Sequence, residues 1–116
     1  MIRIMEALLA RVRRKQAEWE SLRSKVREAL PRLVAVLVQE YGVRRVTLFG
    51  SLLRSTPSER PDIDLLVEGL DSSLRAEALG RLFLLAPVPV DLVPREMGRR
   101  EIVQRALDEG ETLYAA

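Results

Sequence analysis

Apolar residues in the first 30 positions recur every three or four residues, which is the spacing of one face of an α-helix. The positions fall on a seven-residue repeat that Lys15 interrupts: Met5, Leu8, Val12, Trp19, Leu22, Val26 and Ala29. We therefore expect a long helix over residues 3–30. The apolar stripe is narrow and charged residues border it, which favours a helix that faces a partner or a second copy. Packing onto the domain's own core is the alternative.

A second helical pattern follows directly. Pro31 suits the first position of a new helix, and Gly42 can close it. The apolar positions between them form a stripe that we expect to face the core: Leu33, Val34, Leu37, Val38 and Tyr41. We therefore divide the chain into an N-terminal amphipathic helix, residues 1–30, and a domain, residues 31–116.

The rest of the chain alternates between two periods. Short β-branched runs at residues 46–49, 61–67 and 88–93 predict strands, and residues 112–114 predict a short closing strand. Helical spacing over residues 74–85 and 102–107 predicts two further helices, the second ended by Gly110. This order indicates an α/β domain with a small mixed sheet flanked by helices, after a long N-terminal helix.

Composition narrows the chemistry. The 116 residues suffice for one core, and they include no cysteine and no histidine. Thiol chemistry, zinc–thiolate sites and histidine bases are therefore excluded. A general base must be a carboxylate, a lysine, a tyrosine or water. No apolar run has the length of a membrane span and no signal-peptide pattern opens the chain, so we expect a cytoplasmic protein without a membrane partner.

The net charge of +2 is unevenly distributed, because residues 1–30 hold eight basic and four acidic side chains. Arg11, Arg13, Arg14 and Lys15 form a cluster that could contact nucleic acid. A solvated helix face explains such a cluster more simply, so we expect no direct nucleic-acid binding.

The candidate chemistry begins where the first predicted strand ends. Gly50 and Ser51 follow the apolar run directly, so the backbone can turn sharply there and approach a ligand closely. If a helix started at Ser51, its free amide groups would favour an anion such as a phosphate. A Gly-Ser pair after a strand is also common as an ordinary turn.

Two aspartates open the next predicted strand. Asp62 and Asp64 alternate with Ile63, so both carboxylates point to one face, with α-carbons about 6.6 Å apart. Such a pair can bind one magnesium ion or two. Asp91 is a lone charge within a third apolar strand, and it would need a partner or a metal if buried. Solvated aspartates, on a strand end and an edge strand, are the alternative.

The combination of Gly50-Ser51, Asp62-x-Asp64 and the later Asp91 resembles the nucleotidyltransferase superfamily that includes DNA polymerase β. Over residues 32–114 the short chain resembles the minimal nucleotidyltransferases, the antitoxin halves of HEPN–MNT toxin–antitoxin pairs. Two residues depart from the family pattern. Ser55 replaces a glycine after the arginine, and Pro61 replaces a small residue before the first aspartate; neither change removes a ligand.

The resemblance assigns roles to particular residues. Gly50 and Ser51 would hold the β- and γ-phosphates of ATP, and Arg54 matches an arginine of the antitoxin pattern. Asp62 and Asp64 would bind two Mg²⁺ ions, with Asp91 as a third ligand and as a base. An ordinary exposed arginine is the alternative for Arg54.

The resemblance further implies transfer of AMP from ATP to a hydroxyl on a HEPN ribonuclease toxin. A non-catalytic module that neutralises its partner through the N-terminal helix is the alternative, and that helix could also pair with a second copy. Transfer to a small molecule or an RNA end is a third hypothesis, which the short chain disfavours.

Overall fold

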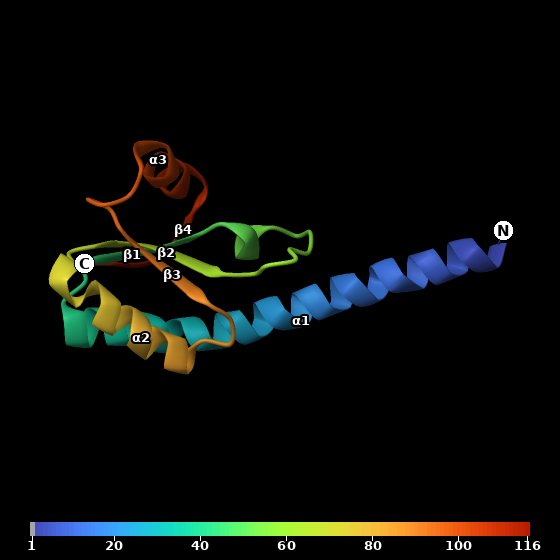
Figure 1. Cartoon of the computed structure of the whole chain (residues 1–116), viewed down its shortest axis with the longest axis horizontal. Helices are drawn as coiled ribbons and strands as arrows, with labels where there is room; N and C mark the ends of the chain where they lie inside the picture. The colour runs from blue at the N-terminus through green and yellow to red at the C-terminus, as the bar shows by residue number, and fades with distance from the viewer. Residues whose placement is uncertain (1) are drawn as a thin grey trace.

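The computed structural model describes residues 2–116 as helices on both faces of one sheet (Figure 1). The elements in chain order are α1 (Ile2–Tyr41), β1 (Arg45–Phe49), η1 (Ser51–Leu53), β2 (Ile63–Glu68), η2 (Ser72–Leu74), α2 (Arg75–Leu85), β3 (Val90–Pro94), α3 (Arg100–Glu109) and β4 (Glu111–Ala115). The α/β class, the small mixed sheet and the long N-terminal helix expected from the sequence are confirmed. No helix among these residues is both long and apolar enough to cross a membrane.

The sheet has the strand order β3-β2-β1-β4. β1 pairs antiparallel with both β2 and β4, whereas β2 and β3 are parallel. A parallel pair needs a crossover, and α2 supplies it. In Figure 1, α1 and α2 lie against one face of the sheet and α3 lies over the other.

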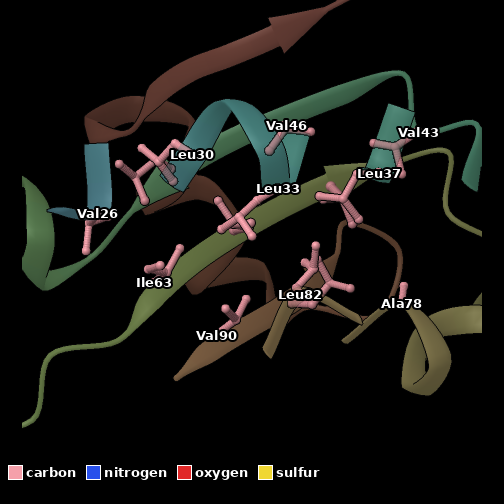
Figure 2. Close-up of a cluster of buried hydrophobic side chains, with 14 of the residues drawn as sticks. Val26, Leu30, Leu33, Leu37, Val43, Val46, Ile63, Ala78, Leu82 and Val90 are labelled. Atoms are coloured by element: carbon pink, nitrogen blue, oxygen red, sulfur yellow. The ribbon is translucent and has the colours of Figure 1, made fainter. Parts of the chain in front are cut away.

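The core lies between the sheet and the two helices α1 and α2 (Figure 2). Leu33 and Leu37 of α1 are fully buried, as are Ile63 of β2 and Leu82 of α2. Alternate residues of β2 and β3 therefore point into this core, and the residues between them point toward α3. That alternation determines where the charged side chains of these strands lie.

The helix break predicted at Pro31 is wrong, because α1 continues from Ile2 to Tyr41 with Pro31 inside it. A proline within a helix costs about 3 kcal/mol, since it has no N–H to donate to the preceding turn. Leu30 and Leu33 on either side of Pro31 are both buried in the core. Their burial keeps both segments on one helix, so the boundary expected at residue 30 coincides with no break in the structure.

The predicted end of this helix is confirmed. Gly42 has a φ of +68°, its N–H donates to the carbonyl of Val38, and the N–H of Val43 donates to the carbonyl of Leu37. This pair of bonds satisfies the last carbonyls of the helix and turns the chain toward β1.

The seven-residue repeat of α1 divides into two halves with different surroundings. Trp19 and Val26 are 3% and 2% exposed, whereas Met5 and Val12 are 58% and 63% exposed. All four positions lie on one helix face, because they are seven residues apart. The stripe is therefore part of the domain core from Trp19 onward, and before Gln16 it faces solvent.

Candidate functional site

Asp64 and Asp91 lie side by side on the sheet face that α3 covers. The parallel register pairs Asp64 of β2 with Asp91 of β3, and the antiparallel register pairs Asp64 with Phe49 of β1. Residues paired in register point to the same face of a sheet. The neighbours Ile63 and Leu92 point the other way and are buried in the core. Asp91 and Asp64 thus share one face.

Asp64 is the predicted carboxylate that its surroundings affect most. The pKa of Asp64 is raised from its usual 3.8 to about 6, chiefly by burial and then by the negative charges of Asp91 and Asp62. Asp62 lies just before β2 and is half-buried. A carboxylate in this situation is one whose charge a bound cation would stabilise.

Asp91 has a cationic neighbour at the edge of the sheet. Arg75, the first residue of α2, places a guanidinium nitrogen 3.8 Å from a carboxylate oxygen of Asp91. Its Nε also donates to the carbonyl of Leu92 over 2.8 Å. Because β3 is an edge strand, this arginine can reach around it and hold the strand that carries Asp91.

The donor set fits a hard divalent cation, since carboxylate oxygens are the ligands that Mg²⁺ prefers. Asp64 and Asp91 provide two of them in direct register. In residues 2–116, however, no three acidic side chains already lie close enough together to hold an ion. The structure thus brings Asp64 and Asp91 together, with Asp62 near enough to affect the pKa of Asp64.

Gly50 lies directly against the Asp64 carboxylate. It has a φ of +86°, and a Cβ at this position would be 2.2 Å from Oδ2 of Asp64. Only glycine therefore allows both this backbone conformation and this carboxylate position. The turn predicted from the sequence is present, and its geometry leaves the space above Asp64 free of side-chain atoms from residue 50.

No long helix follows this turn. Ser51–Leu53 form a single 3-10 turn, in which the N–H of Leu53 donates to the Gly50 carbonyl and that of Arg54 to the Ser51 carbonyl. So short a turn has no substantial dipole, and the anion site expected at the start of a helix at Ser51 does not arise in that way.

A cavity of about 490 Å³ opens above these residues. Gly50, Arg54, Asp64 and Asp91 line one side of it. α3 and the residue before it supply the opposite side, with Arg99, Ile102, Arg105 and Glu109. Ser51 and Asp62 are not among the residues that line the cavity. Four of the six predicted site residues therefore share this space.

The contribution of α3 to the cavity was not expected from the sequence. Arg99 and Arg105 bring two more cations to the cavity, opposite the aspartates. Ile102, an apolar position of the helix expected over residues 102–107, is 42% exposed and lines the cavity. One signal in the sequence could have identified this side of the cavity. Ile102, Arg105 and Glu109 are spaced at i, i+3 and i+7, which places them on one helix face.

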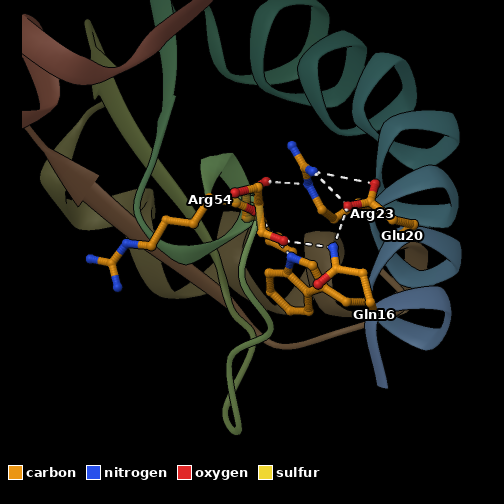
Figure 3. Close-up of polar contacts among 7 residues, drawn as sticks. Gln16, Glu20, Arg23 and Arg54 are labelled. Atoms are coloured by element: carbon orange, nitrogen blue, oxygen red, sulfur yellow. Dashed lines mark hydrogen bonds and ion pairs between the residues drawn. The ribbon is translucent and has the colours of Figure 1, made fainter. Parts of the chain in front are cut away.

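α1 also holds the loop beside the cavity (Figure 3). Gln16, Trp19 and Arg23 each donate a side-chain hydrogen bond to a backbone carbonyl, over 2.8, 3.0 and 3.0 Å; the acceptors are Ser55, Arg54 and Leu52, respectively. The Arg54 side chain points away from α1 in Figure 3 and lines the cavity. The middle of α1 therefore fixes the backbone of the loop that carries this arginine.

The model of the nucleotidyltransferase domain family matches residues 23–113. The chain belongs to this family. The expectation of a nucleotidyltransferase is thereby confirmed, and Gly50, Asp64 and Asp91 all lie within the matched segment. Residues 2–22 precede it, and they include Gln16 and Trp19.

Individual relatives agree with this assignment. The nucleotidyltransferase is 26% identical over 91 residues to the "Putative protein adenylyltransferase MJ1379" of Methanocaldococcus jannaschii, covering 74% of this chain and 91% of that protein. A solved structure of a "putative minimal nucleotidyltransferase" has a TM-score of 0.56 and 29% identity, covering 80% and 93% of the two chains. A toxin-antitoxin structure with AMP-PNP has a TM-score of 0.61 and 24% identity, covering 73% of each chain, and it shows the shared fold.

Proposed function

We propose that this nucleotidyltransferase moves AMP from ATP to a hydroxyl on a partner protein, and that it acts in the cytoplasm as the antitoxin to a HEPN-type ribonuclease toxin. The observation that carries the proposal is the register pairing of Asp64 with Asp91 beneath an arginine-lined cavity. The name of the methanogen relative supports AMP as the group transferred, and the toxin-antitoxin structure with AMP-PNP supports the biological setting.

The charges in the cavity suit a metal-bound triphosphate. Asp64 and Asp91 lie on the sheet, and Arg54, Arg99 and Arg105 lie around the same space. Guanidinium groups bind phosphate oxygens in bidentate fashion, so these arginines would hold the polyphosphate. By the family resemblance, Gly50 and Ser51 would contact its β- and γ-phosphates.

Asp62, Asp64 and Asp91 would hold Mg²⁺, which supplies charge stabilisation for the attacking and leaving oxygens. Asp91 is exposed and would accept the proton of the acceptor hydroxyl. A bond then forms between that oxygen and the α-phosphorus, the bond to the bridging oxygen breaks, and pyrophosphate leaves. Arg54 would offset the charge on the departing phosphates.

Labelled ATP, Mg²⁺ and the candidate toxin test the proposal directly. We expect label on the toxin, loss of its RNase activity, and no transfer by Asp64→Ala. Asp108→Ala is the matched control, because Asp108 is an exposed α3 residue that does not line the cavity. Full transfer by Asp64→Ala would refute the metal assignment.

One observation favours the second candidate, a module that neutralises its partner by contact alone. The apolar positions of α1 before Gln16 are exposed, as a docking helix requires. Deleting residues 1–28 would not test this, because Trp19 and Val26 belong to the core. Deleting residues 2–14 leaves the core whole. Lost neutralisation by this variant, together with no label transfer by the full-length protein, would support the binding module.

A further inference from the structure

The first part of α1 presents an unusually apolar solvent-facing surface for a single helix. Six large apolar side chains in residues 2–12 are 49% to 76% exposed: Ile2, Ile4, Met5, Leu8, Leu9 and Val12. Exposed patches of this kind on a folded protein mark interaction sites. We call residues 2–15 the projecting segment, since α1 extends there beyond the domain (Figure 1).

This surface continues into a groove beside the loop between η1 and β2. The groove encloses about 560 Å³, and its apolar lining includes Val12, Trp19 and Leu22 of α1 with Pro57 of the loop. Lys15, Glu18 and Glu59 add one basic and two acidic side chains to this lining. Val12 belongs to both the exposed stripe and the groove, so the two are continuous. The groove also adjoins Gln16, whose side chain donates to the Ser55 carbonyl. An occupant of the groove would therefore lie next to the loop that carries Arg54.

The charge of the projecting segment indicates which occupant fits. Residues 2–15 carry five basic side chains and one acidic one, Glu6. Pairing with a second copy would bring two such basic segments together, and Lys15 would interrupt the seam. Residues 2–15 contain no aromatic side chain on which a nucleic-acid base could stack.

We propose that the projecting segment docks an acidic amphipathic helix of the acceptor protein, and that the apolar face of this helix continues into the groove. That face covers Met5, Leu8 and Val12, and the carboxylates of the helix lie opposite Arg11 and Lys15. The inference rests on the proposed function for the identity of the acceptor. Docking here places the acceptor next to residues 52–55, at the edge of the cavity, and so raises the local concentration of its hydroxyl at the site.

The test measures binding of the HEPN-type toxin separately from AMP transfer. The double variant Leu8→Asp with Val12→Asp should weaken toxin binding by about 30-fold or more, as removal of an interface hot spot does. Leu84→Asp is the matched control, because Leu84 is an 87% exposed apolar residue on α2. It should bind the toxin within about twofold of wild type. Both variants should bind Mg²⁺-ATP as wild type does, which verifies their fold.

A charge-reversal variant tests the chemistry of the partner. Arg11→Glu with Lys15→Glu should slow association by about tenfold at low salt, with less effect at high salt. An unchanged association rate would contradict an acidic partner. The variant Leu8→Asp with Val12→Asp also tests the other occupants. If its toxin binding is unchanged, loss of a dimer would identify a second copy as the occupant. Loss of binding to anionic vesicles or to RNA would identify a membrane or RNA instead.

The variant Asp64→Asn separates the two proposals. It should bind the toxin as wild type does and transfer no label. Toxin binding that depends on Leu8 and Val12 without any transfer by the wild type would refute the proposed reaction and leave the docking surface established. The opposite result would be transfer by the wild type, with the Leu8→Asp, Val12→Asp variant binding the toxin as tightly as the wild type does. This result would overturn the docking surface and leave the reaction established.

Discussion

The two halves of α1 follow the same seven-residue repeat, yet only one is covered by the rest of the chain. Trp19 and Val26 are buried in the core, while Met5 and Val12, at equivalent positions, are 58% and 63% exposed. The rest of α1, residues 16–41, is the embedded half, and it also donates three hydrogen bonds to residues 52–55. The projecting segment has no such role within the domain. A periodic stripe thus shows that a helix face is to be covered, without showing by what.

The largest difference in stability should appear when leucines of the two halves of α1 are truncated to alanine. Leu37→Ala in the embedded half should lower the free energy of unfolding by about 3 kcal/mol, because Leu37 is fully buried and a cavity would remain. Leu8→Ala in the projecting segment should change it by less than about 0.5 kcal/mol, because Leu8 is 50% exposed. Urea denaturation measures both. Similar losses in the two variants would show that Leu8 is covered within the free protein.

The effect of Asp64 on stability should not depend on the projecting segment. Without Mg²⁺, Asp64→Asn should raise the free energy of unfolding at pH 7 by about 1 kcal/mol. The pKa of Asp64 is raised from 3.8 to about 6, so the ionised carboxylate destabilises the folded state by at most about 3 kcal/mol at pH 7. Partial exposure of the carboxylate reduces this figure. The gain should be the same with and without residues 2–14. The variant should transfer no AMP.

The pH dependence of the wild type provides the check on this gain. Between pH 4 and pH 6 the folded state binds more protons at Asp64 than the unfolded state, so stability should fall as pH rises through this window. Asp64→Asn should lack that part of the fall. Equal slopes for the two proteins, from urea denaturation at each pH, would contradict a raised pKa at Asp64.

Local patterns in the sequence were sufficient to locate the strands and the glycine turn. Gly50 could be recognised because it ends an apolar strand, and the pairing of Asp64 with Asp91 follows from two neighbouring strands with the same alternation. Long-range packing could not be inferred in this way. Pro31 remains within the helix because Leu30 and Leu33 on either side of it are buried in the domain core. No local pattern in the sequence shows that burial.

The residues missed at the site came from distant parts of the chain. Arg99 and Arg105 line the cavity because α3 returns over the sheet, on the face opposite α1 and α2. The repeat places Trp19 on the helix stripe, but its hydrogen bond to the Arg54 carbonyl joins residues 35 positions apart. Side-chain contacts at such separations depend on the tertiary fold, and a single sequence does not specify them.

The junction between the halves can be tested with Trp19→Phe, which keeps a buried ring and removes the indole N–H. Loss of its 3.0 Å bond to the Arg54 carbonyl should cost about 1 kcal/mol and loosen residues 52–55. We expect a several-fold higher KM for ATP. Tyr41→Phe is the matched control, because it removes a donor to Glu77 at the far end of α1. An unchanged KM in Trp19→Phe would show that α1 does not position this loop.

The smallest effect on stability should come from deleting residues 2–14. The deleted side chains are all exposed, and none of them makes a hydrogen bond or ion pair within residues 2–116. We expect the free energy of unfolding to change by less than about 0.5 kcal/mol, because helix ends distant from the core add little. Gln16, Trp19 and Arg23 remain, so affinity for Mg²⁺-ATP should also be retained.

A loss of 2 kcal/mol or more in this deletion would remove the contrast between the two halves, because the segment would then stabilise the domain itself. Retained stability with a lower rate of AMP transfer to the toxin would sharpen the contrast. Residues 2–14, outside the matched family segment, would then bind the acceptor. The embedded half of α1 would stabilise the fold and position the loop. One continuous helix would carry both roles, since the domain covers its apolar stripe only from Trp19 onward.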